Sequence, residues 1–216
     1  MKIRELIKFV NTFGVKVVFD DLDTVGESLC RGDHIIYFTS VEGKERDKYE
    51  RMYKKEKFVS TTSCIHIPDS SVSDIIDAYK NCDGSGMYEF TCNMIGENCG
   101  NIQNMDDAFI VFLFLHEVGH WNQFNKKQCN VKLFIEMDIN LEKENFEKVR
   151  ELVHKRQERI KKGNTCPQTV KERKLAELYM KEYRSIPKEK EADDFALANI
   201  EKSLHLLYQN RKKANM

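Results

Sequence analysis

The stretch Asn104–Trp121 reads NMDDAFIVFLFLHEVGHW and determines how the rest of the chain can fold. Asn104 is a typical helix N-cap, and the two aspartates that follow it suit the positive end of a helix dipole. From Ala108 to Leu115 every residue is apolar, so a helix here has no face to present to water and must lie inside the protein. The sequence therefore predicts a buried helix that ends in the polar motif HEVGH.

The motif HEVGH occupies residues 116–120 and has the spacing of a metal site. On a helix, residues four apart lie about 40° apart around the axis, so His116 and His120 can both direct ring nitrogens at one ion. Glu117 is turned away by about 100°, which suits contact with a metal-bound water. A chain of this composition contains roughly 0.02 such motifs by chance. Two histidines buried without a partner would be costly, so a Zn²⁺ site is favoured over a pair of core histidines.

A catalytic zinc ion needs a third protein ligand and an open fourth position. The downstream segment 187–196 reads PKEKEADDFA, and its Glu189 and Asp193 lie four residues apart. One of them can bind the ion while the other fixes a ligand histidine from behind. Glu191 competes with Glu189 for the ligand role, and an acidic first turn of a helix would explain these residues without any metal. The other histidines form no matching motif: His34, His66, His154 and His205.

The two motifs together resemble those of the gluzincin peptidases, which pair HExxH with a downstream ExxxD helix. The short chain is similar to the compact gluzincins (minigluzincins), particularly ImmA/IrrE-like proteins. The resemblance rests on about 14 residues. It implies that His116, His120 and Glu189 bind zinc. It also implies Glu117 as general base, Asp193 as support for a ligand, and the activity of a zinc metalloendopeptidase that hydrolyses a protein or peptide through a zinc-activated water.

Two further features of such a peptidase can be sought in the sequence. A tyrosine or histidine often stabilises the oxyanion of the tetrahedral intermediate. Tyr179, Tyr183 and His205 are candidates because they lie near the second motif, and spacing does not choose among them. An extended peptide commonly pairs with a sheet edge, which Ser63–Pro68 or Met87–Met94 could supply.

Periodicity predicts short strands before the buried helix and helices after it. Apolar residues at helical spacing favour a helix from Ile3 to Phe13 that stops at Gly14, and Ser71 or Ser73 can cap another through Tyr79. The polar stretch 42–57 is typical of a loop or a solvated helix, and 81–86 of a loop. Alternating or apolar runs predict strands at Val15–Phe19, His34–Thr39, Ser63–Pro68 and Met87–Met94.

Beyond residue 125, 131–139 alternates like a strand, although a helix is also compatible with so short a run. Helices are expected at 141–162 and 170–183, with a break at 163–167 between them, and a further helix from Pro187, which is tolerated in a first turn.

These elements predict an α+β fold: a compact zincin-like domain with a small early β-sheet, a buried HExxH helix and a mostly helical C-terminal half. We expect one catalytic domain. Residues 1–125 form its N-terminal part, 126–186 a charged, mainly helical insertion, and 187–216 a C-terminal helix that carries the third ligand. The insertion reflects the 68 residues that separate His120 from Glu189.

The net charge is zero but unevenly spread: residues 1–125 carry 13 basic and 20 acidic side chains, and the remainder carry 22 and 15. The signs alternate along the second half, as on solvated helices, so nucleic-acid binding is not expected. Residues 126–186 could instead bind a protein partner. The alternative to a peptidase is therefore a non-enzymatic zinc-binding regulatory or interaction protein that binds its partner through these charged helices.

The cysteines and the chain start indicate a cytoplasmic protein without a membrane segment. The seven cysteines are odd in number and include no Cys-x-x-Cys pair, unlike a secreted disulfide framework. A metal site at Cys82, Cys92 and Cys99 is conceivable, but buried or free thiols are favoured. The first residues carry an acidic group and polar breaks, unlike a signal peptide, and the longest apolar run is far shorter than the roughly 20 residues that span a bilayer.

Overall fold

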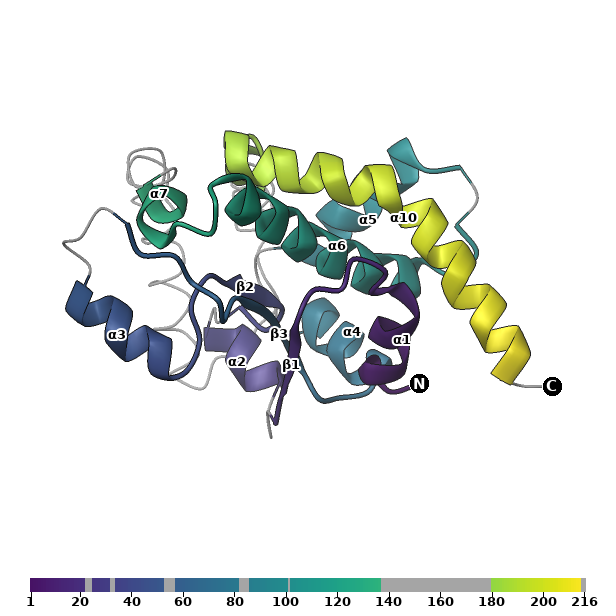
Figure 1. Ribbon diagram of the computed structural model, residues 1–216. Coiled ribbons are helices and arrows are strands. Elements are labelled where there is room, and N and C mark those ends of the chain that lie inside the picture. The colour runs from purple at the N-terminus through teal and green to yellow at the C-terminus, as the bar shows by residue number, and fades with distance from the viewer. Residues whose placement is uncertain are drawn as a thin grey trace, which may run out of the picture.

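The computed structural model describes residues 1–21, 25–31, 34–52, 57–81, 86–100, 102–136 and 180–214. Within these ranges the fold is α+β, with a small sheet and helices packed around one buried helix (Figure 1). In chain order the elements are α1 (Ile3–Val10), β1 (Val17–Asp20), α2 (Val25–Arg31), β2 (Tyr37–Thr39), α3 (Lys44–Met52), β3 (Cys64–Pro68), α4 (Val72–Asn81), α5 (Met87–Asn98), α6 (Met105–Lys126), α7 (Val131–Glu136) and α10 (Pro187–Ala214).

The three strands form a mixed sheet in the order β1-β3-β2. β1 pairs with β3 in parallel, with Val17 opposite Ile65, and β2 pairs with β3 antiparallel, with Phe38 opposite Ile65. Ile65 and Ile67 are fully buried and belong to the main core, whereas His66 between them is half-buried. One face of the sheet therefore packs on the core, and the other carries polar side chains, as alternation along a strand requires.

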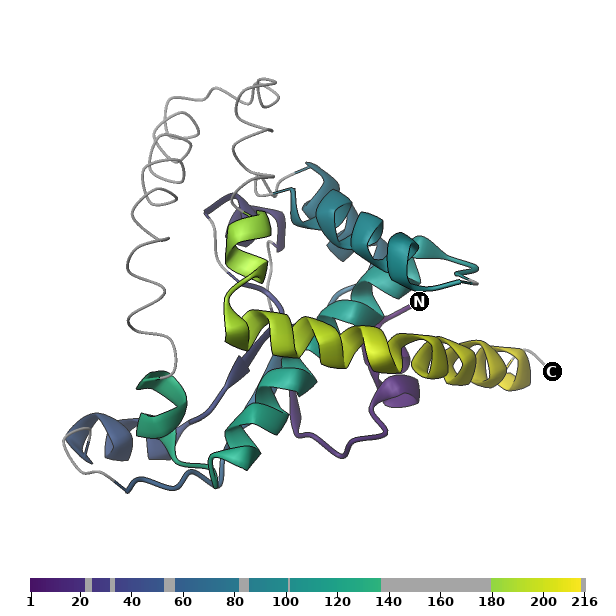
Figure 2. The ribbon, with the colours of Figure 1, turned by 90° about the horizontal axis from the view of Figure 1, so that it is seen from above.

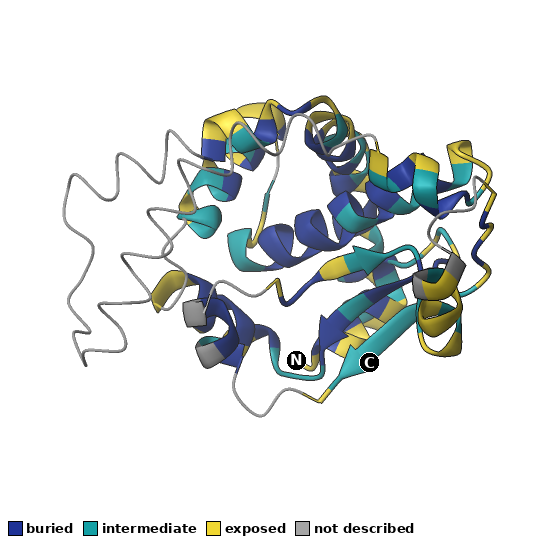
Figure 3. Ribbon diagram, turned by 90° about the vertical axis from the view of Figure 1, so that its left-hand side faces the viewer, coloured by how far each residue is buried: buried dark blue, intermediate teal, exposed yellow. Residues whose placement is uncertain are grey.

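Helix α6 lies inside the molecule, as its apolar sequence predicts. Figure 3 shows buried residues, in dark blue, along the helix that runs through the middle of the fold. The side chain of Asn104 accepts a hydrogen bond from the backbone N–H of Asp107 at 3.1 Å, which confirms the predicted N-cap. Because α6 has no solvated face over its central turns, the elements around it must cover it on every side.

Helix α10 crosses α6 and covers the side of it that lies away from the sheet (Figures 1 and 2). Its residues facing the core repeat at helical spacing and begin with two alanines, Ala192 and Ala196, followed by Ile200 and Leu204. Gly119 of α6 lies against Ala192 so closely that a Cβ built on Gly119 would be 2.8 Å from the Ala192 Cα. The two backbones therefore touch at the HEVGH motif.

Two segments that we expected to be strands are helices. Met87–Met94 lies in α5, where Met87, Thr91 and Ile95 recur every fourth residue on its packed side. Its apolar residues follow a helical period that the strand prediction overlooked. For 131–139, the helical alternative is the one the structure adopts over Val131–Glu136: the side chain of Asn130 accepts a hydrogen bond from Leu133 N–H and caps α7.

Most other predicted elements are present with shifted ends. The structure confirms the first helix, the three early strands, a solvated helix within 42–57, the Ser71 cap of α4 and the helix from Pro187. Helix α2 was not expected from the sequence. Of the predicted elements in the C-terminal half, 141–162, 163–167 and most of 170–183 lie outside the described residues.

No helix in the described part of the chain is both long and apolar enough to cross a membrane.

The close crossing of α6 and α10 gives a first prediction. Gly119→Ala places a methyl group against the Ala192 backbone, and such overpacking typically costs about 1–3 kcal/mol. We expect lower stability in chemical denaturation and weaker metal binding by the motif, because the helices must separate. Gly96→Ala in α5 is the matched control: its Cβ meets no heavy atom within 4 Å, so stability should stay equal or rise by up to about 1 kcal/mol. Equal stability of both variants would contradict the close contact between the backbones of α6 and α10 at Gly119.

Candidate metal centre

The structure brings His116, His120 and Glu189 together in the interior between α6 and α10. The Nε2 atoms of His116 and His120 lie 3.1 Å apart. Glu189, in the first turn of α10, places Oε2 3.2 Å from His116 Nε2 and Oε1 3.5 Å from His120 Nε2. All three residues are buried. Two side chains from one helix and one from another thus direct three donor atoms at a common point.

Each histidine is held from behind by an acceptor at its other ring nitrogen. His116 Nδ1 lies 2.8 Å from Asp193 Oδ1, and His120 Nδ1 lies 2.9 Å from Gln123 Oε1. A carboxylate oxygen or an amide oxygen can only accept, so each Nδ1 carries a proton, and each Nε2 that carries none directs its lone pair inward. Two such lone pairs beside a carboxylate would repel one another, so the arrangement requires a proton or a metal ion between the two nitrogens.

Arg184 is a buried cation at the same site. Its Nη1 donates to Asp193 Oδ1 at 2.6 Å and lies 3.0 Å from His116 Nδ1. Its Nη2 donates to the sulfur of Met87 at 3.0 Å, which links α5 to the site. The guanidinium therefore fixes the Asp193 carboxylate that in turn orients His116. The sequence did not reveal this role, because Arg184 precedes α10 and belongs to neither motif.

The electrostatics of the site favour a charged carboxylate at Glu189. Burial raises the pKa of Glu189, but His116 and His120 outweigh it and hold that pKa well below its usual range. Burial and Arg184 lower the pKa of His116, whereas Asp193, Glu189 and Glu117 together outweigh them and raise it to about 9. Oε2 of Glu189 nevertheless makes no hydrogen bond of good geometry within the described part of the chain. A buried anionic oxygen is thus left available to a cation.

The structure distinguishes Glu189 from its competitor Glu191. The Glu191 carboxylate is about half exposed and accepts from Lys126 Nζ at 2.5 Å. It also accepts from Gln123 Nε2 at 3.2 Å, so its contacts lie behind His120 and not among the converging donors. Gln123 itself was missed in the sequence, although its position three residues after His120 places it on the same helix face.

Glu117 lies beside the triad formed by His116, His120 and Glu189, and it faces the edge of the sheet. Its Oε2 accepts a hydrogen bond from the backbone N–H of Phe38 in β2 at 2.7 Å. Neither segment that the sequence predicts as a sheet edge is one: Ser63–Pro68 corresponds to β3, the central strand, and Met87–Met94 is helical. β2 is the edge strand next to α6.

The three candidates for an oxyanion-stabilising residue lie in different places. His205 is exposed on α10 and lies 2.7 Å from Gln209 Nε2. It follows Glu189 by 16 residues, about 24 Å along a helix, so it does not belong to this site. Tyr183 is half-buried next to Arg184, whose guanidinium carbon lies 5.9 Å from its ring centroid. Tyr179 lies outside the described residues.

Of the three cysteines considered as a second metal site, Cys92 and Cys99 have free thiols. Cys92 lies within α5 and Cys99 directly follows that helix, whereas Cys82 lies outside the described residues. Neither described thiol belongs to a group of converging metal donors within the described ranges.

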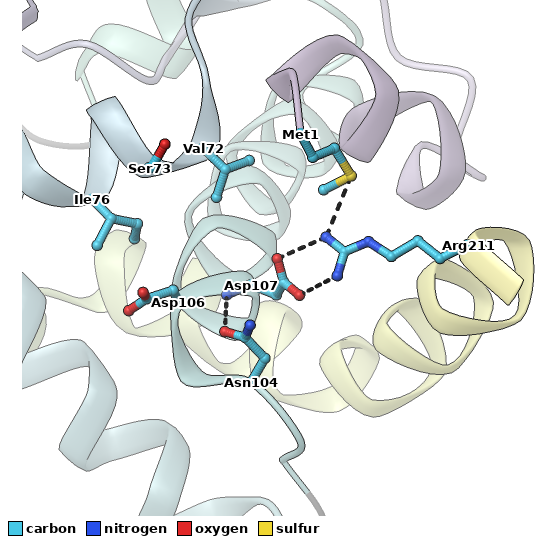
Figure 4. A pocket seen from close by; sticks show the side chains of 8 residues that line it. All are labelled: Met1, Val72, Ser73, Ile76, Asn104, Asp106, Asp107 and Arg211. Atoms are coloured by element: carbon cyan, nitrogen blue, oxygen red, sulfur yellow. Dashed lines mark hydrogen bonds and ion pairs between the residues drawn. The ribbon is translucent and has the colours of Figure 1, made fainter. Parts of the chain in front are cut away.

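A surface pocket lies at the opposite end of α6, between α1, α4 and the last turns of α10 (Figure 4). There Arg211 forms two ion-pair contacts with the buried carboxylate of Asp107, at 2.5 and 2.8 Å, and its Nη2 lies 3.3 Å from the sulfur of Met1. Asp107 precedes His116 by nine residues, about 13 Å along the helix. The ion pair between Asp107 and Arg211 joins α6 to α10 at this pocket, whose lining does not include His116, His120 or Glu189.

His116, His120 and Glu189 form a buried group positioned to bind a metal ion. No protein-family model, curated protein or solved structure matches the chain.

The triad gives a second prediction, which separates the two glutamates. Glu189→Gln removes the anionic donor, so metal affinity should fall by at least the roughly 10–100-fold that follows the loss of a residue supporting a ligand. Glu191→Gln is the matched control and should bind metal as the wild type does, because Glu191 pairs with Lys126 at the surface. Competition titration against a chromophoric chelator measures both affinities. Equal losses in the two variants would contradict this ligand set.

Proposed function

We propose that this protein is a zinc-dependent metallopeptidase of the compact gluzincin type, built on a zincin-like domain. The observation that carries the proposal is the convergence of His116, His120 and Glu189 on one buried point. Glu117, beside that point, meets the backbone of an edge strand that could hold a peptide. Both motifs that resemble those of the gluzincins, HEVGH and the segment from Glu189 to Asp193, thus supply residues to a single site.

The distances and the donor types support zinc as the ion. A tetrahedral zinc with ligands at about 2.0–2.1 Å holds its donor atoms about 3.3–3.4 Å apart. The two Nε2 atoms are 3.1 Å apart, and each lies close to one oxygen of Glu189: His116 Nε2 is 3.2 Å from Oε2 and His120 Nε2 is 3.5 Å from Oε1. Two imidazoles and one carboxylate are also a frequent donor set of catalytic zinc, which leaves the fourth position to solvent or substrate. Bound there, zinc would lower the pKa of a water ligand to about 7 and polarise a carbonyl.

In the proposed reaction Glu117 is the general base. The N–H of Phe38 holds one oxygen of its carboxylate, which fixes the group on the side of the triad that faces β2. Glu117 takes a proton from the attacking water and then passes it to the leaving amine nitrogen. Asp193 and Gln123 keep the two histidines in the orientation that ligand binding needs, and Arg184 keeps Asp193 in place.

The position of β2 supports an extended peptide as the substrate. The N–H of Phe38 points to Glu117 and so away from β3. In an antiparallel strand the C=O of the same residue points to the same side, so it is directed to that edge as an acceptor. An extended peptide that pairs with β2 would accordingly lie along the catalytic glutamate, and its backbone would supply the matching N–H donor.

A third prediction tests catalysis separately from metal binding. Glu117→Gln should lower kcat/KM on a peptide library by roughly 10²–10⁴-fold, the usual contribution of general acid–base catalysis. The same variant should retain one equivalent of zinc in the triad, because Glu117 is not among its donors. Glu97→Gln, at an exposed position of α5, is the control and should leave both quantities unchanged.

Two outcomes would count against a peptidase. If the wild type cleaves nothing that Glu117→Gln leaves intact, while zinc and partner binding persist in both, the non-enzymatic regulatory or interaction protein is the better description. If the purified wild type neither contains nor binds zinc, the metal-dependent function itself fails.

A further inference from the structure

A second convergence of metal donors lies on the polar face of the sheet. Cys64 and His66 are two residues apart on β3, so they project from the same face, opposite the fully buried Ile65 and Ile67. The Sγ of Cys64 lies 3.5 Å from the Nε2 of His66. Glu42, three residues after β2, brings a carboxylate oxygen within 4.8 Å of the Cys64 sulfur and of a ring nitrogen of His66. Sulfur, nitrogen and oxygen donors from two segments therefore meet at one place.

His66 is oriented for a ligand role by a carboxylate behind it. Its Nδ1 lies 3.0 and 3.1 Å from the two oxygens of Asp20 in β1. A carboxylate only accepts, so Nδ1 carries a proton, and Nε2 is the ring nitrogen that faces Cys64. Tyr37 stacks on the ring at 4.8 Å between centroids and fixes its plane. Metal-binding histidines almost always have such a carboxylate or carbonyl partner at the second nitrogen.

The separation of the two strongest donors matches a zinc-type ion. A tetrahedral ion with a sulfur ligand at about 2.3 Å and a nitrogen ligand at about 2.0 Å holds those atoms about 3.5 Å apart, which is the separation of Cys64 Sγ and His66 Nε2. Glu42 already binds Lys16 Nζ at 2.5 Å through Oε2. A carboxylate offers about four lone-pair sites, so Glu42 can keep that ion pair and still supply a donor.

Cys64, His66 and Asp20 also contact one another in the order of a Cys-His-Asp nucleophilic triad, but the surroundings of the thiol argue against that role. Cys64 is fully buried, and burial together with the adjacent Glu42 raises the pKa of its thiol to about 12. A nucleophilic cysteine needs an electropositive, partly exposed setting. An anionic neighbour disfavours a free thiolate but favours a bound cation, and coordination deprotonates the thiol.

We propose that Cys64, His66 and Glu42 bind a second divalent ion of the zinc type, with Asp20 as the positioning residue of His66. Binding releases the thiol proton of Cys64 to solvent, and a water molecule can complete the coordination. The ion would join the segment after β2 to β3. Phe38 in β2 donates a hydrogen bond to Glu117, so the ion would also stabilise the strand that borders the first site. The second site depends on none of the residues that bind the first ion.

Cobalt substitution distinguishes the two sites, because a thiolate bound to Co²⁺ gives a charge-transfer absorption in the near ultraviolet and the triad of His116, His120 and Glu189 contains no thiolate. We expect metal-free full-length protein titrated with Co²⁺ to bind two ions, and the thiolate band to saturate at one per chain. The band should vanish in Cys64→Ser and in His66→Ala. It should remain in Cys92→Ser and His205→Ala, which are matched controls outside both sites, and in the double variant His116→Ala/His120→Ala.

The proposal would be overturned if the wild type showed no thiolate band, or if the band persisted in Cys64→Ser. Because Cys64 is buried, Glu42→Gln and Asp20→Asn provide a second test at partly exposed positions. Each should weaken the cobalt affinity reported by the band by about 10–100-fold. Unchanged affinity in both would also overturn it. A retained band in a protein without hydrolytic activity would separate failure of the proposed peptidase from failure of this site.

Discussion

The contact between the backbones of α6 and α10 is the constraint on which the candidate site depends. Gly119 allows the two helices to meet at Ala192, and only at that separation does the first turn of α10 reach the two histidines of α6. Glu189 and Asp193 lie one turn apart on α10, so one helix supplies both a donor and the support of a ligand. The glycine in HEVGH is therefore part of the site although it offers no donor atom.

Much of this arrangement could be predicted, because the strongest signals are local. The apolar run before His116 requires burial in any fold, and the N-cap at Asn104 fixes where that helix begins. Four-residue spacing places donors on one face of a helix without knowledge of the fold. The choice between Glu189 and Glu191 was not local. It depends on which face of α10 turns to α6, and that is set by the packing of Ala192 and Ala196.

The parts that could not be predicted depend on contacts between distant segments. Arg184 has no sequence signal for its role, since its partners are Asp193 and a methionine 97 residues away. The order of strands also escapes a single sequence: β3 lies between two strands that precede it in the chain, so the apolar run 63–68 is central instead of at the edge. The donors of the second proposed site, Glu42, Cys64 and His66, show no motif spacing in the sequence. The pairing of β2 with β3, and not helical periodicity, brings them together.

Charge balance gives an independent reason to expect a divalent ion between the histidines. Among the described residues around the triad, Glu117, Glu189 and Asp193 contribute three negative charges and Arg184 one positive charge. Two net negative charges in a largely buried site are costly unless something compensates them. A proton on His116, whose pKa is raised to about 9, compensates half of that charge in the metal-free protein. A divalent ion compensates all of it and displaces that proton, so metal binding and proton release should be coupled at this site.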